Sequence, residues 1–516
     1  MPAALSILAT LFFLHAAPAT VWEATLAESN GTELLVRMHV ERNGERWAMY
    51  SRPGGVLPMI PWRQRLLGRL LRRLPPHGAL IHLTDGTARA VGDSVVLRGT
   101  LESPFLGKRV LVGWMKGDRM QAELRRGSDT GAVGGTLSAV PARRSGSSRD
   151  YPAIASNVRQ TMSDLVFDAA LPRSPGFVRF FAEFDKAAAR ATDDLDLVVA
   201  FTTLSPLLKT SHFNFIRNPV IAATPLDSLI ERNSNVDPAS FVRLQFPAAG
   251  LADLQVRRWD RVGPAIDRAF ERIDSAKVRV LMLDIRGNPG GDPSAFVPLT
   301  HLLRDTTWIG AAVGRKWYAN NSRHPSIADY SAFPVISSAN EARELLHLVT
   351  RGGAAAGRIA PRAPYFAGTM YLLINEGTGS ASELVAHTLK MTKRATLVGQ
   401  RTAGALLTAL PHPVGDGFIV TVPEADFIAA DGTRIEGNGV EPDLRANGGE
   451  AMIVVGEQVR RELPYAGAVW LGFSYMTLRR YDDSERAWLE ALALAPTEAS
   501  KRAIEARLAA ARNAKR

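Results

Sequence analysis

The chain of 516 residues contains no cysteine, and this absence excludes several kinds of chemistry together. Without a thiol there is no disulfide, no thiolate zinc site and no cysteine nucleophile. Long apolar runs are scarce as well, because nothing after the run Leu5–Leu14 approaches the ~20 apolar residues that a membrane-spanning helix needs. We predict no cofactor, and the cellular compartment must be inferred from the N-terminus instead.

The N-terminus has the order of a secretory signal peptide. The apolar run Leu5–Leu14 is followed by the small residues of 15–20, which favours cleavage after Ala19. We therefore expect residues 1–19 to be a signal peptide and the mature protein to be exported, either periplasmic or secreted. The first residues carry no Lys or Arg, so an uncleaved anchor or a buried N-terminal helix stays open as the alternative.

Basic residues outnumber acidic ones and give a formal net charge of +11. Most of them are dispersed arginines, which are typical of a solvated surface, and we predict no nucleic-acid partner. The segment Trp62–Leu74 differs, because it places leucines on one helical stripe and arginines off it. This segment is predicted either to pack on its own domain or to contact an anionic membrane surface.

Changes in residue pattern divide the chain into segments of different fold class. Short alternating stretches separated by Gly and Asp turns predict a β-rich accessory domain over 20–145, and the polar run Arg143–Asp150 is the first linker candidate. Helical spacing predicts a helical subdomain over 150–218. We expect an α/β core over 219–447 and a helical tail over 460–516.

The core shows the order strand, helix, strand that is typical of a βαβ unit. A strand at 241–246, a helix at 262–273 and a buried strand at 278–287 predict parallel strands covered on both faces. The fold class is therefore α/β, with a mixed or parallel sheet and with chemistry at the carboxyl ends of its strands. We expect this domain to close near Ala446.

The tail has the pattern of helices about a turn. Residues 464–496 predict two helices joined near Arg480–Asp483, and the spacing around Trp470 and Tyr475 resembles one tetratricopeptide repeat with a partial helix behind it. A single repeat cannot bury its own apolar face, so we expect it to pack on the core or on a protein partner.

The stretch Thr369–Gly404 carries the best candidate for a nucleophile. An apolar run predicts a buried strand, Gly377 and Gly379 break it and a helix follows, so Ser380 falls at a strand-to-helix turn. A hydroxyl there lies beside unpaired backbone N–H groups and the positive end of a helix dipole. Ser380 is also a good N-cap, with Glu383 completing a capping box, so both interpretations stay open.

Three motifs stand in one order: LMLDIRGNPGG at Leu281–Gly291, INEGTGSASE at Ile374–Glu383 and GVEPD at Gly439–Asp443. Together they resemble those of the C-terminal processing (tail-specific) serine peptidases, whose relatives include the tricorn core protease and interphotoreceptor retinoid-binding protein. The resemblance covers roughly residues 156–446. It implies a serine endopeptidase that hydrolyses peptide bonds of a peptide or protein substrate through an acyl-enzyme.

The resemblance also assigns roles position by position. Ser380 matches the acylated nucleophile, and the N–H of Ala381 with the region of Gly290 and Gly291 matches the oxyanion hole. Two backbone N–H groups aimed at one oxygen are what a tetrahedral acyl intermediate needs.

The chain departs from the family at the general base. The processing peptidases place a lysine in a Gly-Lys-Gly turn, whereas the matching stretch Thr402–Ala405 contains none. The tricorn branch implies instead a Ser-His pair with a late glutamate, which assigns His212 as the base and Ser211 and Glu436 as its supports. Histidine suits this task, with an unperturbed pKa near ~6.5, although His212 alone would be read as a structural histidine.

Other candidate bases fit less well. Lys390 and Lys393 lie in or near the helix after Ser380 and fit solvated helix residues. His387 lies one heptad after Ser380 and is expected to point down the helix rather than at the turn.

A second departure is the missing PDZ module, because the chain between His212 and Val280 is too short for one. Selection of C-terminal tails by that route is therefore not expected. The rival from another class is a binding or scaffolding protein that kept the fold and lost catalysis.

Overall fold

The computed structural model describes residues 20–51, 79–103, 107–142, 149–225, 236–345, 348–349 and 353–515. The predicted signal peptide 1–19, the segment Trp62–Leu74 and most of the linker candidate Arg143–Asp150 lie outside these residues. Among the helices that are described, none has the length and apolar character needed to cross a bilayer.

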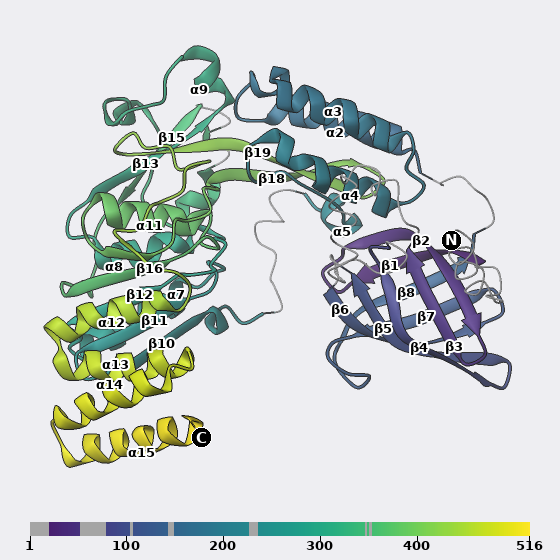
Figure 1. Ribbon diagram of the computed structural model, residues 1–516. Helices are drawn as coiled ribbons and strands as arrows, with labels where there is room; N and C mark the ends of the chain where they lie inside the picture. The colour runs from purple at the N-terminus through teal and green to yellow at the C-terminus, as the bar shows by residue number, and fades with distance from the viewer. Residues whose placement is uncertain are drawn as a thin grey trace, which may run out of the picture.

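The N-terminal part is a closed antiparallel barrel in which each strand pairs with the next and the last returns to the first (Figure 1). Its strands are β1 (Thr20–Glu28), β2 (Glu33–Asn43), β3 (Arg46–Ser51), β4 (His82–Val91), β5 (Ser94–Ser103), β6 (Gly107–Lys116), β7 (Arg119–Arg125) and β8 (Val133–Pro141). Alternate side chains point inward and are buried, as the period of a strand requires. The prediction of a β-rich N-terminal region is confirmed.

A layer of helices follows the barrel, as the helical spacing predicted. It consists of α2 (Tyr151–Leu165), α3 (Pro175–Ala188) and α4 (Asp194–Leu204). Their apolar stripes meet in a cluster of aromatic rings, in which Phe180 packs edge-on against Phe201 and Phe201 stacks on Phe215. This cluster and the barrel interior form one continuous hydrophobic core.

The N-terminus of α4 fastens this layer to the barrel. The buried carboxylates of Asp193 and Asp194 accept hydrogen bonds from the N–H groups of Arg37 and Leu35 on β2, each at 2.8 Å. Asp193 is also the N-cap of α4, because it accepts from the N–H of Asp196. The two carboxylates of this short turn therefore accept hydrogen bonds from backbone N–H groups of both the start of α4 and strand β2.

A mixed sheet with the order β10-β11-β12-β16-β17-β20 forms the centre of the remaining chain. Its strands are β10 (Val242–Ala248), β11 (Leu251–Val256), β12 (Val280–Asp284), β16 (Thr369–Ile374), β17 (Thr396–Gly399) and β20 (Leu444–Arg445). All neighbours run parallel except β10 and β11, which are antiparallel. The predicted mixed or parallel sheet is confirmed.

The βαβ unit begins one strand later than predicted. The strand expected at 241–246 is β10, which turns back at Gly250, a residue with φ of +79° that only glycine adopts readily. The missed strand β11 then pairs in parallel with β12, across the helix α7 (Gly263–Ser275). β11 is buried on both faces, so it shows no alternation that marks it as a strand.

Helices cover both faces of this sheet. On one face lie α7, α8 (Phe296–Leu302) and α11 (Ala381–Met391). On the other face lie α12 (Glu450–Glu462) and the start of α13 (Pro464–Thr477), whose Val455, Val459 and Trp470 pack on the sheet.

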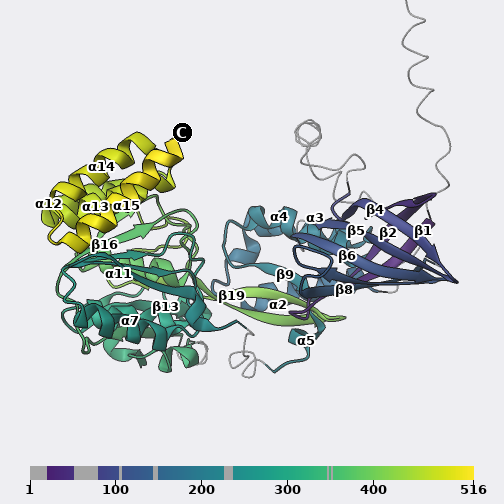
Figure 2. The same ribbon diagram turned by 90° about the horizontal axis from the view of Figure 1, so that it is seen from below.

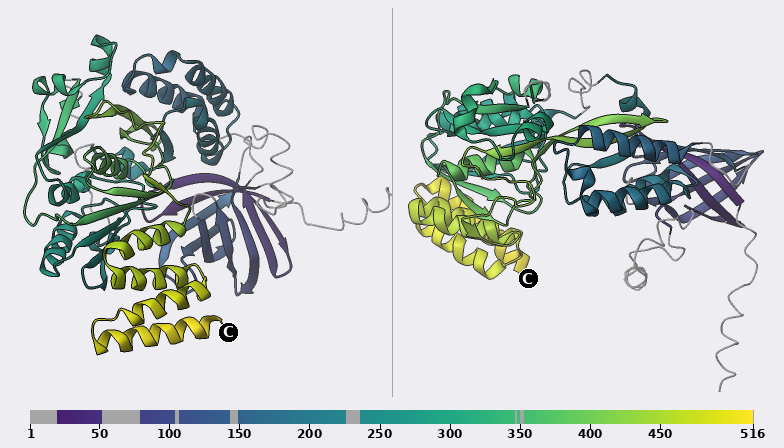
Figure 3. Two further views of the ribbon diagram at one scale, coloured as in Figure 1. Left: turned by 60° about the vertical axis from the view of Figure 1, so that its left-hand side comes forward. Right: turned by 90° about the horizontal axis from the view of Figure 1, so that it is seen from above.

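The expectation that the core closes near Ala446 stays a prediction, and α12 and α13 pack on the sheet beyond that residue. Without α12 and α13 the outer face of β12 and β16 would be bare, so these helices complete the sandwich. The helices α14 (Tyr481–Ala493) and α15 (Glu498–Lys515) stack outward from α13 (Figure 3). The predicted helical tail is confirmed, and its likeness to a tetratricopeptide repeat stays a prediction.

A second sheet, with the order β14-β15-β13-β19-β18, joins the core to the helical layer. Its strands are β13 (Thr307–Gly314), β14 (Val335–Ile336), β15 (Ala354–Ile359), β18 (Leu407–Gly415) and β19 (Phe418–Ala429). One half of β19 pairs with β13 in the core, and the other half pairs with β9 (Asn214–Arg217) beside the helical layer (Figure 2).

Short helices complete the description. The α-helices α5 (Pro219–Ala222) and α9 (Arg315–Asn320) follow β9 and β13 along the chain. Short 3-10 helices occur at Leu171–Arg173, Ser205–Leu208, Pro238–Phe241, Pro293–Ala295, Ile327–Ala332 and Glu341–Glu344.

Candidate active site

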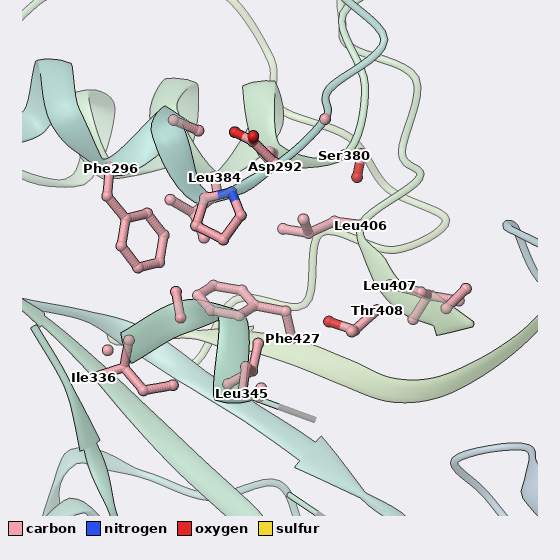
Figure 4. Close-up of a pocket in the computed structure, with 18 of the residues that line it drawn as sticks. Asp292, Phe296, Ile336, Leu345, Ser380, Leu384, Leu406, Leu407, Thr408 and Phe427 are labelled. Atoms are coloured by element: carbon pink, nitrogen blue, oxygen red, sulfur yellow. The ribbon is translucent and has the colours of Figure 1, made fainter. Parts of the chain in front are cut away.

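Ser380 lies in the turn between β16 and α11, as predicted, with φ of +53°. A non-glycine residue in such a conformation costs on the order of 1–3 kcal/mol and needs its surroundings to hold it there. The Ser380 N–H provides that hold by donating to the Ala405 carbonyl at 2.8 Å and to Glu383 Oε2 at 3.1 Å. Figure 4 shows the hydroxyl on the cavity side of the turn.

Glu383 is the centre of the support beneath Ser380. Its buried carboxylate also accepts from Thr402 Oγ1 at 2.6 Å and from the N–H groups of Gly404 and Ala405, each at 2.7 Å. Burial raises the pKa of Glu383, while these hydrogen bonds favour its ionised form. The stretch Thr402–Ala405, which matches the lysine turn of the processing peptidases, is thus hydrogen-bonded to Glu383.

His212 reaches Ser380 from a different part of the chain. It lies between the 3-10 helix Ser205–Leu208 and β9, and its Nε2 is 3.4 Å from Ser380 Oγ. Its Nδ1 is 2.6 Å from Ser211 Oγ. Ser211 in turn contacts Glu436 twice, through its N–H to Oε1 and through its Oγ to Oε2, each at 2.8 Å.

These contacts fix the tautomer of His212. The Ser211 hydroxyl donates to Glu436 Oε2. Ser211 Oγ must then accept from Nδ1–H, which leaves the lone pair of Nε2 facing Ser380. Burial lowers the pKa of His212 below its ordinary value of 6.5, and the charge of Glu436 partly opposes this effect.

The other candidate bases lie elsewhere. His387 Nε2 is 3.1 Å from both carboxylate oxygens of Asp431, two residues after the end of β19. Lys390 Nζ contacts the Glu441 carbonyl and lies 3.3 Å from Asp443. Each has its own partner away from Ser380.

The expected oxyanion hole is only partly present as predicted. The N–H of Gly290 donates to Asn288 Oδ1 at 3.0 Å, so the expectation that Gly290 is a donor is wrong. Its carbonyl accepts from the Trp259 N–H at 3.1 Å, and because the peptide is trans, the following N–H of Gly291 points away from Trp259. The N–H groups of Gly291 and Ala381 have no partner among the hydrogen bonds of the described chain.

Gly290 is needed for its lack of a side chain. A Cβ at this position would lie 2.6 Å from the Cβ of Ser380. The glycine therefore allows its loop to pass directly beside the nucleophile.

Trp259 is a site residue that the sequence analysis missed. Its backbone holds the loop of Gly290 and Asp292 through hydrogen bonds of 3.1 and 2.6 Å. Its fully buried indole Nε1 donates to Ser382 Oγ at 2.8 Å, two residues after the nucleophile. Trp259 thus ties together the two segments that carry the amides of Gly291 and Ala381. An isolated tryptophan outside the three motifs gives no pattern by which to find it.

A cavity of about 530 Å³ opens beside Ser380 (Figure 4). Polar groups of His212, Asp292 and Thr408 lie among its lining residues. Most of the lining is apolar and includes Phe296, Ile309, Ile336, Leu345, Leu384, Leu406 and Phe427. Among the described residues no group of three or more His, Cys, Asp or Glu is placed to hold a metal ion.

Comparison with known proteins now identifies the domain around this site. Residues 250–446 match the family model described as peptidase family S41. Residues 250–446 therefore form a domain of peptidase family S41, and the match covers less than half of the chain.

Curated relatives carry related names. The chain is 26% identical over 201 residues to a carboxy-terminal-processing protease of Bartonella bacilliformis, covering 39% of this chain and 37% of the relative. It is 23% identical over 260 residues to a carboxyl-terminal-processing protease of Synechocystis, covering 50% of each. It is 33% identical over 87 residues to carboxyl-terminal-processing peptidase 1 of Arabidopsis thaliana chloroplasts, covering 17% of this chain and 18% of the relative. The match thus spans half or less of each relative.

The similarity to solved structures is weak, both in sequence identity and in TM-score. The photosystem II D1 C-terminal processing protease has a TM-score of 0.37 and 15% identity, covering 58% of this chain and 94% of that one. The tricorn protease has a TM-score of 0.36 and 11% identity, covering 83% of this chain and 52% of that one.

Proposed function

We propose that the protein is a serine peptidase that hydrolyses peptide bonds through an acyl-enzyme on Ser380. The observation that carries this proposal is the continuous chain of contacts from Glu436 through Ser211 and His212 to Ser380. A serine hydroxyl is a weak nucleophile until a base takes its proton. In this series of contacts His212 is the base, with the lone pair of its Nε2 facing the Ser380 hydroxyl.

In the first step His212 Nε2 accepts the proton of Ser380 Oγ as the oxygen attacks the carbonyl carbon. The separation of 3.4 Å is longer than a working hydrogen bond, and such contacts tighten when substrate binds. Ser211 and Glu436 stabilise the imidazolium that forms. Its Nδ1–H donates to Ser211 Oγ, and the Ser211 hydroxyl donates to the carboxylate of Glu436.

The tetrahedral intermediate carries a negative oxygen that needs donors. We assign this role to the N–H groups of Gly291 and Ala381, the latter at the positive end of α11. Each such donor is worth about 2.7–4 kcal/mol in the transition state. His212 then returns its proton to the leaving amine, and water hydrolyses the acyl-enzyme by the same steps.

The substrate must place an apolar group next to the bond that is cleaved. The apolar part of the cavity lies beside Ser380, and filling it removes apolar surface from water. The rival function, binding without catalysis, uses the same cavity and is decided by the reactivity of Ser380.

Two further features of the proposal concern location and partners. The apolar run Leu5–Leu14 supports export to the periplasm or the outside of the cell. The outward helices α14 and α15 support a protein partner at the tail, because α12 and α13 already pack on the sheet.

A fluorophosphonate probe tests the proposal directly. We expect one serine to be labelled and peptide mapping to locate it at Ser380, with labelling lost in Ser380→Ala and strongly reduced in His212→Ala. His387→Ala is the matched control, because His387 pairs with Asp431 instead. Absence of labelling in the parent protein, with the fold intact, would favour the binding protein.

A further inference from the structure

The cavity beside Ser380 is larger than one amino-acid side chain requires. Its volume is about 530 Å³. An apolar protein cavity of about 150 Å³ is enough to hold a benzene ring. The lining residues Ile336 and Leu345 lie on the side of the cavity away from Ser380 (Figure 4), so the space is deep as well as wide.

Small residues create this depth. Ala312 on β13, Ala355 on β15 and Ala342 on the 3-10 helix Glu341–Glu344 are buried and line the cavity. Gly357 on β15 lines it too, and a Cβ there would meet Ile309 Cγ1 at 2.8 Å. Larger residues at these positions would fill the space that lies beyond the first apolar contacts.

A peptide substrate would use this space poorly. Successive side chains of an extended peptide point to opposite sides, so one residue next to the cleaved bond sends one side chain into a one-sided cavity. A carboxylic ester differs, because its acyl carbon can carry an unbranched chain of any length. The cavity is therefore matched to a long apolar chain attached directly to the reacting carbonyl.

We propose that the protein also hydrolyses esters of medium- and long-chain carboxylic acids, with the acyl chain in this cavity. The inference rests on the proposed chemistry of Ser380. Ser380 Oγ bonds to the acyl carbon, the ester C–O bond breaks, and the alcohol leaves with the proton that His212 took from Ser380. Water then adds to the acyl-enzyme, and the free carboxylic acid leaves as the Ser380 hydroxyl is restored.

The experiment is a chain-length series on the full chain. The substrates are the p-nitrophenyl esters of acetate, butyrate, hexanoate, octanoate and dodecanoate. We expect kcat/KM to rise about three- to fourfold for each methylene that enters the cavity, at least as far as octanoate. The measured quantity is the ratio of the octanoate rate to the acetate rate.

Two variants fill the cavity from different elements. Ala355→Leu and Ala342→Leu should each lower this ratio at least tenfold, because the added side chain occupies the space of the acyl chain. Ala332→Leu makes the same change at an exposed position of the 3-10 helix Ile327–Ala332 and should leave the ratio unchanged. A variant that fails to fold is recognised by its circular dichroism, and the second variant then gives the answer.

The outcomes separate this inference from the proposed function. If peptides are cleaved and Ser380 is labelled, but acetate is the fastest ester, the inference is overturned and the peptidase stands. A chain-length gain that survives in both cavity variants also overturns it, because the gain then arises outside the cavity. If Ser380 is not labelled at all, both fail. The inference is supported if the ratio of the octanoate rate to the acetate rate falls in the two cavity variants and stays unchanged in Ala332→Leu.

Discussion

Replacing His212 is the sharpest test of the proposed mechanism, because the stretch Thr402–Ala405, which matches the lysine turn of the processing peptidases, contains no lysine. His212→Ala removes the group whose Nε2 lies 3.4 Å from Ser380 Oγ. A positioned general base contributes about 10²–10⁴ to the rate. We therefore expect kcat to fall at least 10²-fold, with KM changed much less, since the apolar lining residues of the cavity are unchanged.

The dependence on pH gives an independent measure of the same residue. His212 works as a base only when it is neutral, so activity should rise as pH rises through its pKa. Burial lowers this pKa below 6.5, and the charge of Glu436 opposes the effect. The midpoint of the rise should therefore lie below 6.5. Glu436→Gln should move it lower still and should reduce kcat less than the loss of His212 does, because an orienting carboxylate does not itself move the proton.

The assay is hydrolysis of a peptide or ester substrate from about pH 5 to 9, with initial rates for parent, His212→Ala and Glu436→Gln. Lys390→Ala is the control for a lysine base, because Lys390 is held by Asp443 and the Glu441 carbonyl. Full activity in His212→Ala, or a midpoint above about pH 8 that Lys390→Ala abolishes, would refute the reasoning.

Three further predictions follow from other parts of the structure. Ser382→Ala leaves the buried Trp259 Nε1–H without its acceptor and should lower kcat about tenfold with little change in KM. Steady-state kinetics of Ser382→Ala, Trp259→Phe and the double variant measure this effect. The losses in the two single variants should not add in the double variant, because both variants remove the same hydrogen bond. Gly290→Ala combines a φ of +103° with a Cβ only 2.6 Å from that of Ser380, so probe labelling should fall by 10² or more, and normal labelling would contradict the packing described. The mature chain should begin near Thr20, as N-terminal sequencing of secreted material will show, and an intact Met1 on protein from the cytoplasm would sink the export proposal.

Much of the fold could be predicted from the sequence where one period dominates. Barrel strands such as β3 and β7 alternate between buried and more exposed residues, and α2 and α3 carry apolar stripes, so the type of both regions could be predicted. Strand β11 was missed because it is buried on both faces and therefore does not alternate. Helix α12 was missed because nothing local shows that its apolar stripe covers a sheet formed by residues far away in the chain.

The nucleophile could be predicted where motif and turn chemistry coincide, whereas the base and its supports could be predicted only through the family resemblance. Ser380 and Ala381 follow from the strand-to-helix turn, whereas the contact of His212 with Ser380 joins residues 168 positions apart, which no local pattern contains. Gly290 was expected as a donor because the motif contains two adjacent glycines. In the structure the Gly290 N–H donates to Asn288 Oδ1, and the Gly291 N–H is left as the candidate donor for the site. The side chain of Asn288, in the same turn, therefore determines which of the two glycine amides is available.

Strand β19 joins the part of the molecule that carries His212 to the part that carries Ser380. At one end of this strand Phe418 stacks on Phe215 of β9 with ring centroids 5.2 Å apart, within the core shared by the barrel and the helical layer. At its other end Phe427 lines the cavity beside Ser380, and Glu436 follows a few residues later. A single strand, paired with β13 at one end and with β9 at the other, therefore joins the core that carries Ser380 to the strand that begins two residues after His212. None of the described barrel residues lines the cavity beside Ser380. The barrel nevertheless stabilises the helical layer next to His212, because Asp193 and Asp194 bond α4 to β2.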